Sequence, residues 1–112
     1  MIERESNYKA DAIGDNGNSL GLMQIQPKWN AERMERLGCV DLLDPFQNVT
    51  VGIDVLAELI DKDTDLYWVL MAYNGGQAYA TKNMKNETYS DYAIYVTERA
   101  TELEKEIEEI EY

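Results

Sequence analysis

The amino-acid sequence predicts a mainly α protein with a short loop or small hairpin near residues 11–22. Apolar residues recur every three or four positions along several segments, which is the spacing of one buried helix face. Both prolines and several of the seven glycines stand where these segments begin or end, as expected at helix boundaries. Residues 11–22 are instead rich in Gly, Asn and Asp, which favours turns. A chain of 112 residues, 45% of them hydrophobic, suits one domain with one core.

The first two helices are predicted from their boundaries. Residues 1–10 are expected to hold the end of a helix, with Ile2 and Tyr8 as apolar contacts. A second helix is expected over residues 27–37, because its leading proline fits the first turn of a helix. Gly38 can then end this helix in the left-handed conformation.

The central core helix is predicted to start at Asp44 and Pro45, an N-cap followed by a proline at the first helical position. Six apolar residues then follow at helical spacing and predict its buried face. They are Phe46, Val49, Ile53, Leu56, Ala57 and Ile60.

Two short helices are expected next. Asp65 can cap the first of them, which ends at Gly75-Gly76. A small helix around residues 79–84 follows. The apolar positions of the first short helix are Leu66, Val69, Leu70 and Tyr73.

The last helix is predicted to begin at Ser90 and carries a narrow apolar seam of heptad type. The seam consists of Ala93, Val96, Ala100, Leu103, Ile107 and Ile110. Residues 98–112 also hold seven Glu against Arg99 and Lys105. We expect this helix to pack back on its own domain; the alternative is that its far end extends toward a partner or a missing domain.

Composition excludes several classes of function. The chain has no His, so Ser-His and Cys-His nucleophiles are impossible within it, and the commonest transition-metal ligand is missing. Acid–base chemistry must therefore use carboxylates, tyrosines or lysines. A formal charge of −12 argues against nucleic-acid binding. No cofactor and no metal site are expected.

Other sequence features are less informative. Cys39 is the single cysteine and is expected to be a buried structural thiol. No apolar run reaches the roughly 20 residues of a membrane span, and no signal peptide opens the chain. Asn48 and Asn86 begin N-x-T triplets, which match glycosylation acceptors, but Asn48 lies inside a predicted helix.

Three motifs in order carry a specific resemblance. They are Glu5-Ser6, the Gly-Leu-Met-Gln-Ile segment 21–25 and the Ala-Tyr-Asn-Gly-Gly segment 72–76, with a looser match at Tyr95-Val96. This combination resembles the SLT-type lytic transglycosylases and the related goose-type lysozymes, in the lysozyme-like superfamily. The resemblance implies a lysozyme-like domain over residues 1–97, with a truncated first helix. Residues 98–112, with their excess of Glu, are expected to form an acidic C-terminal helical extension of the same domain.

The resemblance also implies roles for residues early in the chain. Glu5 would be the catalytic acid that protonates the leaving oxygen of a peptidoglycan glycosidic bond. Ser6 would orient this glutamate or a substrate acetamide group. Met23 and Gln24 would line the substrate groove beside the acid. Without the resemblance, Glu5 reads as a surface glutamate and Met23 as a packing residue.

Later residues complete the site that the family implies. Tyr73 would hold the catalytic region and Asn74 would bind the sugar, facing the glutamate across the cleft. Tyr95 matches the tyrosine of the family's final motif. In isolation, the Asn-Gly-Gly sequence at the end of this helix is a simple stop signal.

The outcome of the reaction depends on Asp15. A lytic transglycosylase uses one carboxylate and forms 1,6-anhydro-muramoyl ends, whereas a goose-type lysozyme positions a water molecule with aspartates. Asp15 matches one such aspartate, but Gln26 occupies the place of the second, and an amide cannot act as a base. We therefore favour the transglycosylase; a hydrolase using Asp15 and a non-catalytic wall-binding or assembly domain are the alternatives.

The substrate implied is the peptidoglycan glycan strand. Because peptidoglycan lies outside the cytoplasm, an extracytoplasmic location is expected, with the chain as part of a longer secreted or membrane-anchored protein.

Overall fold

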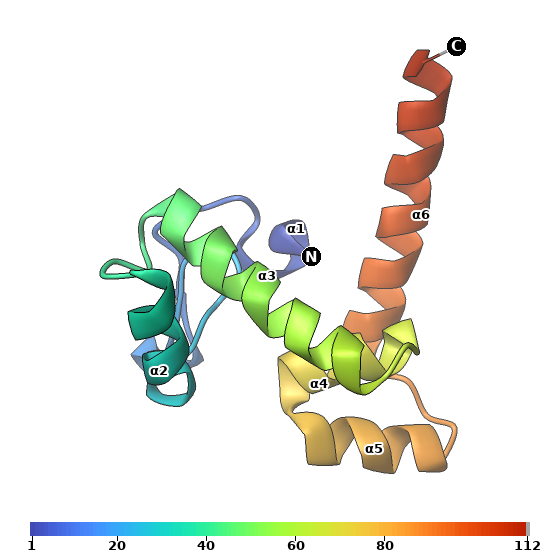
Figure 1. The fold of residues 1–112 in the computed structure, drawn as a ribbon. Coiled ribbons are helices and arrows are strands. Elements are labelled where there is room, and N and C mark those ends of the chain that lie inside the picture. Colours follow the sequence, from blue (N-terminus) through green and yellow to red (C-terminus); the bar gives the residue numbers. More distant parts are fainter. Residues whose placement is uncertain (112) are drawn as a thin grey trace. The chain divides into compact units, whose positions relative to one another are not determined.

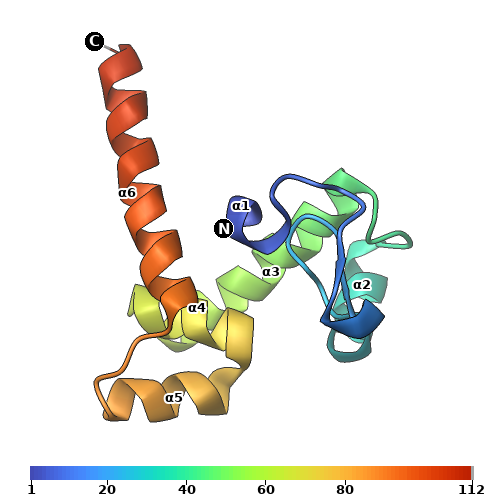
Figure 2. The same ribbon diagram turned by 180° about the vertical axis from the view of Figure 1, so that it is seen from behind.

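The computed structural model describes residues 1–111, and their side chains through residue 108. It divides into two compact units, Met1–Ala57 and Glu58–Tyr112. Helices dominate both units (Figures 1 and 2), which confirms the mainly α prediction. The predicted small hairpin near residues 11–22 is also present, as two short antiparallel strands.

The first unit contains a short helix, the hairpin, a second helix and most of a long third helix. Their bounds are α1 Ile2–Ser6, β1 Ile13–Gly14, η1 Asp15–Gly17 (a 3-10 turn), β2 Ser19–Leu20, α2 Pro27–Leu37 and α3 Pro45–Lys62, which continues into the second unit. Ile13 pairs with Leu20 and Gly14 with Ser19 in the hairpin. The expected contact of Tyr8 is wrong, because its side chain is 62% exposed and follows the end of α1.

The predicted ends of α2 and α3 are confirmed. Gly38 lies in the left-handed region with φ 72° and caps α2. The Asp44 side chain accepts the backbone N–H of Gln47 at 2.9 Å, as an N-cap does, and Pro45 is the first residue of α3. These boundaries were predictable because each depends on side chains within a few residues of the helix end.

The predicted buried face of α3 is wrong. Phe46 is 81% exposed and Ile53 58% exposed, whereas the buried positions include Asn48, Val51 and Gly52. Asn48 and Gly52 stand one helical turn apart, so they belong to the same face. An asparagine and a glycine do not contribute to a periodicity of apolar residues, so the sequence pattern predicted the wrong face of α3 as buried.

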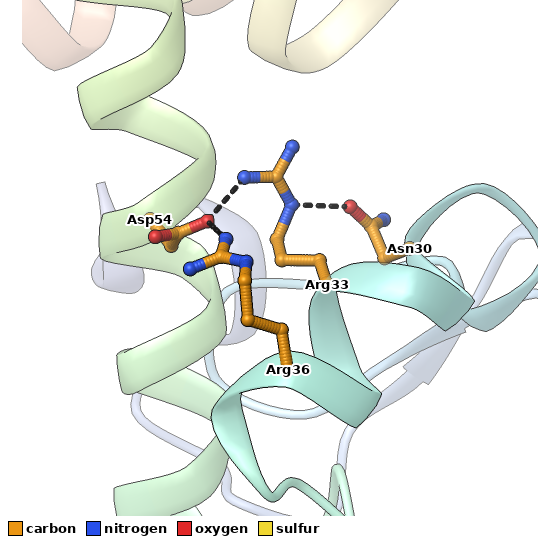
Figure 3. A network of polar contacts seen from close by, with 4 residues as sticks. All are labelled: Asn30, Arg33, Arg36 and Asp54. Carbon is orange, nitrogen blue, oxygen red and sulfur yellow. Dashed lines mark hydrogen bonds and ion pairs between the residues drawn. The ribbon is translucent and has the colours of Figure 1, made fainter.

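Two arginines connect α2 to α3 (Figure 3). Arg33 and Arg36 each approach Asp54 Oδ2 at 2.5 Å, and Arg33 also donates to the Asn30 side chain at 3.2 Å. The hydrogen bond from Arg36 is the largest cause that holds the pKa of Asp54 below its ordinary value, with Arg33 adding to it against partial desolvation. The ionised carboxylate thus helps to fix the two helices.

The second unit consists of α4 Leu66–Gly75, α5 Gln77–Lys85 and α6 Asp91–Glu111, together with the end of α3. The Asp65 side chain accepts the backbone N–H of Tyr67 at 2.9 Å, which confirms the predicted cap. The core of the second unit includes Val69, Met71 and Ala93, with exposures of 2% or less. Leu66, one of the predicted apolar contacts, is instead 49% exposed.

Only the first part of α6 carries buried side chains within the described residues. Ala93 and Val96 are buried, but residues 101–108 are all exposed, with Ile107 at 56%. The expectation that the whole apolar seam packs back on the domain is therefore wrong for these residues. Ile110 and Tyr112, the far end of the predicted extension, lie outside the described side chains. Within the described chain, no helix is both long and apolar enough to cross a membrane.

Candidate active site

Glu5 lies on the last turn of α1, where its side chain is half-buried. Its backbone N–H donates to the Met1 carbonyl at 2.9 Å. Ser6 is 8% exposed, and its hydroxyl donates to the Ile2 carbonyl at 3.1 Å. This bond satisfies the Ser6 proton locally but leaves the oxygen with lone pairs that can accept a hydrogen bond.

Left-handed backbone is concentrated around these motifs. Six non-glycine residues in the described chain have a positive φ, and five of them lie between positions 7 and 24. Two follow Ser6 directly, at Asn7 and Tyr8, and a third is Gln24. Such conformations cost on the order of 1–3 kcal/mol for a non-glycine residue and cluster at functional sites. Of these five residues, Gln24 lies within a motif, and Asn7 and Tyr8 follow the Glu5-Ser6 motif directly.

Asp15, Ser19 and Gln26 form a directed chain of hydrogen bonds. The Ser19 hydroxyl, 1% exposed, donates to Asp15 Oδ2 at 2.5 Å and accepts from Gln26 Nε2 at 3.3 Å. The two positions that a goose-type aspartate pair would occupy are therefore linked through one serine. Asp15 itself is exposed to solvent.

The segment that carries Met23 and Gln24 is a tight turn closed by Leu20 and Ile25. These two residues exchange both backbone hydrogen bonds at 2.9 Å. The Gln24 side chain donates to the Gly21 carbonyl at 2.9 Å, and also to that of Ala12 at 3.2 Å, so it is held against the backbone.

Met23 points into the core of the first unit. Its side chain is 3% exposed, and a Cβ added at Gly52 would collide with its sulfur atom. The packing interpretation of Met23 therefore describes the structure, and any contact it makes with a ligand is restricted to this small exposed fraction.

Sequence reasoning missed Asn48, which connects this turn to α3. The fully buried amide accepts the Met23 N–H at 2.8 Å and donates to the Leu20 and Leu42 carbonyls, each at 2.8 Å. A buried side chain with three hydrogen bonds is not a glycosylation acceptor in the folded state. The signal available in the sequence was a polar residue inside a predicted helix, at a position outside its apolar periodicity.

Tyr73, Asn74 and Tyr95 belong to the second unit. Tyr73 is half-buried and Asn74 exposed near the C-terminus of α4, while Tyr95 is 42% exposed on α6. Gly76 follows with φ 94°, a conformation that favours glycine, so the stop-signal interpretation of this motif also holds.

The described residues contain no group of three or more Cys, Asp or Glu side chains that could hold a metal ion. The candidate residues of the first unit offer a half-buried carboxylate at Glu5 and, on the segments around Ser19 and Gln24, neutral amide and hydroxyl groups. Such a set suits proton transfer to a neutral substrate oxygen.

Comparisons with known proteins agree with the motifs. The family model described as the transglycosylase SLT domain matches residues 1–96. A protein of Enterobacteria phage PRD1 named "Transglycosylase" is 34% identical over 89 residues, which cover 80% of this chain and 32% of that protein. The chain thus spans about a third of the length of this relative. No solved structure matches.

Proposed function

Because the chain belongs to the transglycosylase SLT domain family, a family of peptidoglycan lytic transglycosylases, we propose that it cleaves the β-1,4 bond between N-acetylmuramic acid and N-acetylglucosamine. Glu5 is the general acid and base, and the products carry 1,6-anhydro-muramoyl ends. The observation that carries this proposal is the family match, since residues 1–96 include every motif of the candidate site. The half-buried position of Glu5 on α1 supports it further.

Glu5 donates a proton in the first step of the reaction and accepts one in the second. The protonated carboxyl gives its proton to the O4 oxygen of the leaving N-acetylglucosamine as the bond from C1 breaks. The muramic N-acetyl oxygen stabilises the positive charge on C1. Glu5, now ionised, takes the proton of the muramic 6-hydroxyl, whose oxygen bonds to C1. The enzyme regains its protonated acid, and no water is consumed.

The Asp15–Ser19–Gln26 chain favours this route over hydrolysis. A water-activating base requires a carboxylate, and in this chain of hydrogen bonds Asp15 alone has one, with its Oδ2 atom engaged by the short bond from Ser19. Gln26 donates into the same chain and cannot take a proton. Asp15 is nevertheless exposed to solvent, so a hydrolase in which it positions water is the second candidate.

The remaining site residues are proposed to bind the glycan. Gln24, Asn74 and Tyr95 offer amide and hydroxyl groups of the kind that hold sugar hydroxyls and acetamides. Tyr73 supports the catalytic region, and Ser6 accepts from a substrate acetamide or the Glu5 carboxyl.

Action on peptidoglycan places this chain outside the cytoplasm. We propose that it works as the cutting domain of a longer protein, with the exposed residues 101–108 of α6 available to a partner or a further domain.

Mass spectrometry of the soluble products from purified peptidoglycan tests the proposal. Anhydro muropeptides, about 18 Da lighter than reducing ends because no water is added, are expected from the wild type and absent with Glu5→Gln. Glu3→Gln is the matched control, since Glu3 lies on the same short helix and accepts a hydrogen bond from Tyr8. Reducing ends would instead establish the hydrolase. No product, with wall binding intact, would make this a binding domain.

A further inference from the structure

The turn formed by residues 20–25 is bonded to α3 through the side chain of Asn48. Leu20 and Ile25 close the turn with two backbone bonds, yet the N–H of Met23, near its middle, donates outward to Asn48 Oδ1 at 2.8 Å. The same amide donates to the Leu20 carbonyl at the start of the turn. Asn48 thus bonds to the turn at two backbone positions.

Asn48 also uses its remaining donor. Its second N–H binds the Leu42 carbonyl at 2.8 Å, in the loop between α2 and α3. Both donors and one acceptor position of the amide are therefore used, at 0% exposure. Aspartate would lose both donors, and serine and alanine are too short to bridge three backbone groups at once. The position requires asparagine for its hydrogen-bonding pattern and its length.

The packing around the turn leaves little room for another arrangement. A Cβ at Gly21 would collide with both the Leu42 carbonyl oxygen and the Asn48 amide. One helical turn after Asn48, the absence of a side chain at Gly52 makes room for the Met23 side chain. Met23 is therefore attached to α3 at two points, its backbone to Asn48 and its side chain to Gly52.

We propose that Asn48 is a positioning residue for catalysis: it holds the 20–25 turn, and with it the strained Gln24, in the conformation that binds the glycan. This inference rests on the proposed function, because Gln24 matters to turnover only if this segment contacts substrate. Gln24 keeps a φ of 51° that a glutamine adopts only when its surroundings enforce it. Without Asn48, the bonds to the Met23 N–H and the Leu42 carbonyl are lost, and the Leu20 carbonyl keeps only the bond from the Ile25 N–H. The turn then relaxes and Gln24 moves.

The test compares Asn48→Ala with Val51→Ala. Val51 is also fully buried on α3, so its truncation destabilises the same helix without removing a hydrogen bond from the turn. At a temperature where both variants are folded, Asn48→Ala is expected to lower kcat/KM by 10- to 100-fold, the order produced by a displacement near 1 Å. Val51→Ala is expected to stay within about threefold of the wild type. If Asn48→Ala fails to fold, Asn48→Ser takes its place in the test, because its hydroxyl can keep one of the hydrogen bonds. Its expected loss of kcat/KM lies between those given for Val51→Ala and Asn48→Ala.

Amide hydrogen exchange at Met23 supplies a measurement that needs no activity. The Met23 N–H is expected to be protected in the wild type and in Val51→Ala, and to exchange at least tenfold faster in the Asn48 variant after scaling to global stability. An unchanged protection factor, or a loss of kcat/KM no greater than that of Val51→Ala, would overturn the proposal. A wild type without products would instead overturn the proposed function, while the exchange data would still decide whether Asn48 holds the turn.

Discussion

Gly21 and Gly38 allow the close packing of the 20–25 turn to be separated from backbone strain. Both glycines have a positive φ, 79° and 72°, so alanine at either position must adopt the left-handed conformation. That conformation costs an L-residue about 1–2 kcal/mol. The two positions differ in their surroundings, because a Cβ at Gly38 would meet nothing within 4 Å, whereas one at Gly21 would collide with the Leu42 carbonyl oxygen.

The expected losses follow from these surroundings. Gly38→Ala should cost about 1–2 kcal/mol, from backbone strain alone. Gly21→Ala should cost roughly 1–3 kcal/mol more, because the obstacle is a backbone carbonyl together with the hydrogen-bonded Asn48 amide, neither of which can move freely. In a domain of about 100 residues each kcal/mol lowers Tm by roughly 4 °C.

Thermal unfolding followed by far-UV circular dichroism measures the difference directly. We expect Gly21→Ala to melt about 4–12 °C below Gly38→Ala. Equal melting temperatures for the two variants would refute the reasoning, because they would mean that the approach of α3 and its preceding loop to the turn adds nothing to the backbone strain at Gly21.

Two further perturbations test the packing of α3. Asp54→Asn should lower the free energy of unfolding by about 1 kcal/mol at neutral pH. The folded-state pKa of Asp54 is depressed, chiefly by Arg36. The stabilisation by the ionised carboxylate is therefore present above the unfolded pKa of 3.8 and is lost as the pH falls below it. The gap between variant and wild type in urea unfolding should therefore close as the pH falls through the depressed folded-state pKa of Asp54, and a constant gap would contradict the ion-pair account. Gly52→Ala should destabilise by about 1–2 kcal/mol, because displacement of Met23 outweighs the roughly 1 kcal/mol gain in helix propensity; a more stable variant would show that Met23 adapts without cost.

Local signals in the sequence were sufficient for the helix boundaries. Pro27 and Gly38 bound α2, and Asp65 caps α4, because each acts on backbone groups within one turn of itself. The motifs were sufficient for the family, which the match over residues 1–96 confirms. The buried face of α3 was not predictable in the same way.

The reason is the chemistry of the contact that α3 makes. Its buried face receives a turn of backbone, which needs an amide at Asn48 and an empty space at Gly52. A periodicity of apolar side chains identifies contacts between side chains and cannot identify this one. Phe46, the first apolar residue of the predicted face, is mostly exposed as a result. The exposure of residues 101–108 could not be predicted either, because a heptad seam specifies a partner surface without specifying which one.

The hydrogen bonds around Ser19 make a last prediction, concerning Gln26. Ser19 has one hydroxyl proton, which it gives to Asp15, and it accepts from the Gln26 amide. Gln26→Glu preserves the size of the side chain but replaces the donor with a carboxylate that has no proton to give. Two carboxylates would then face one buried hydroxyl, and their repulsion should raise the pKa of the introduced group.

The sign of the resulting pH dependence is opposite to that of Asp54. A raised folded-state pKa destabilises the fold as pH rises through the unfolded value of about 4.3, so Gln26→Glu should be about 1 kcal/mol less stable than the wild type at neutral pH and nearly equal below about pH 4. The additional change Asp15→Asn removes one of the two charges and should restore stability at neutral pH. Two results would contradict this account: a single variant as stable as the wild type at neutral pH, or a double variant that does not regain the lost stability. Either would mean that the hydrogen bonds of Ser19 do not disfavour a carboxylate at position 26. If both expected results are obtained, the single proton of Ser19 explains why position 15 holds a carboxylate and position 26 an amide. A carboxylate at position 26 would then require a change at Ser19 as well.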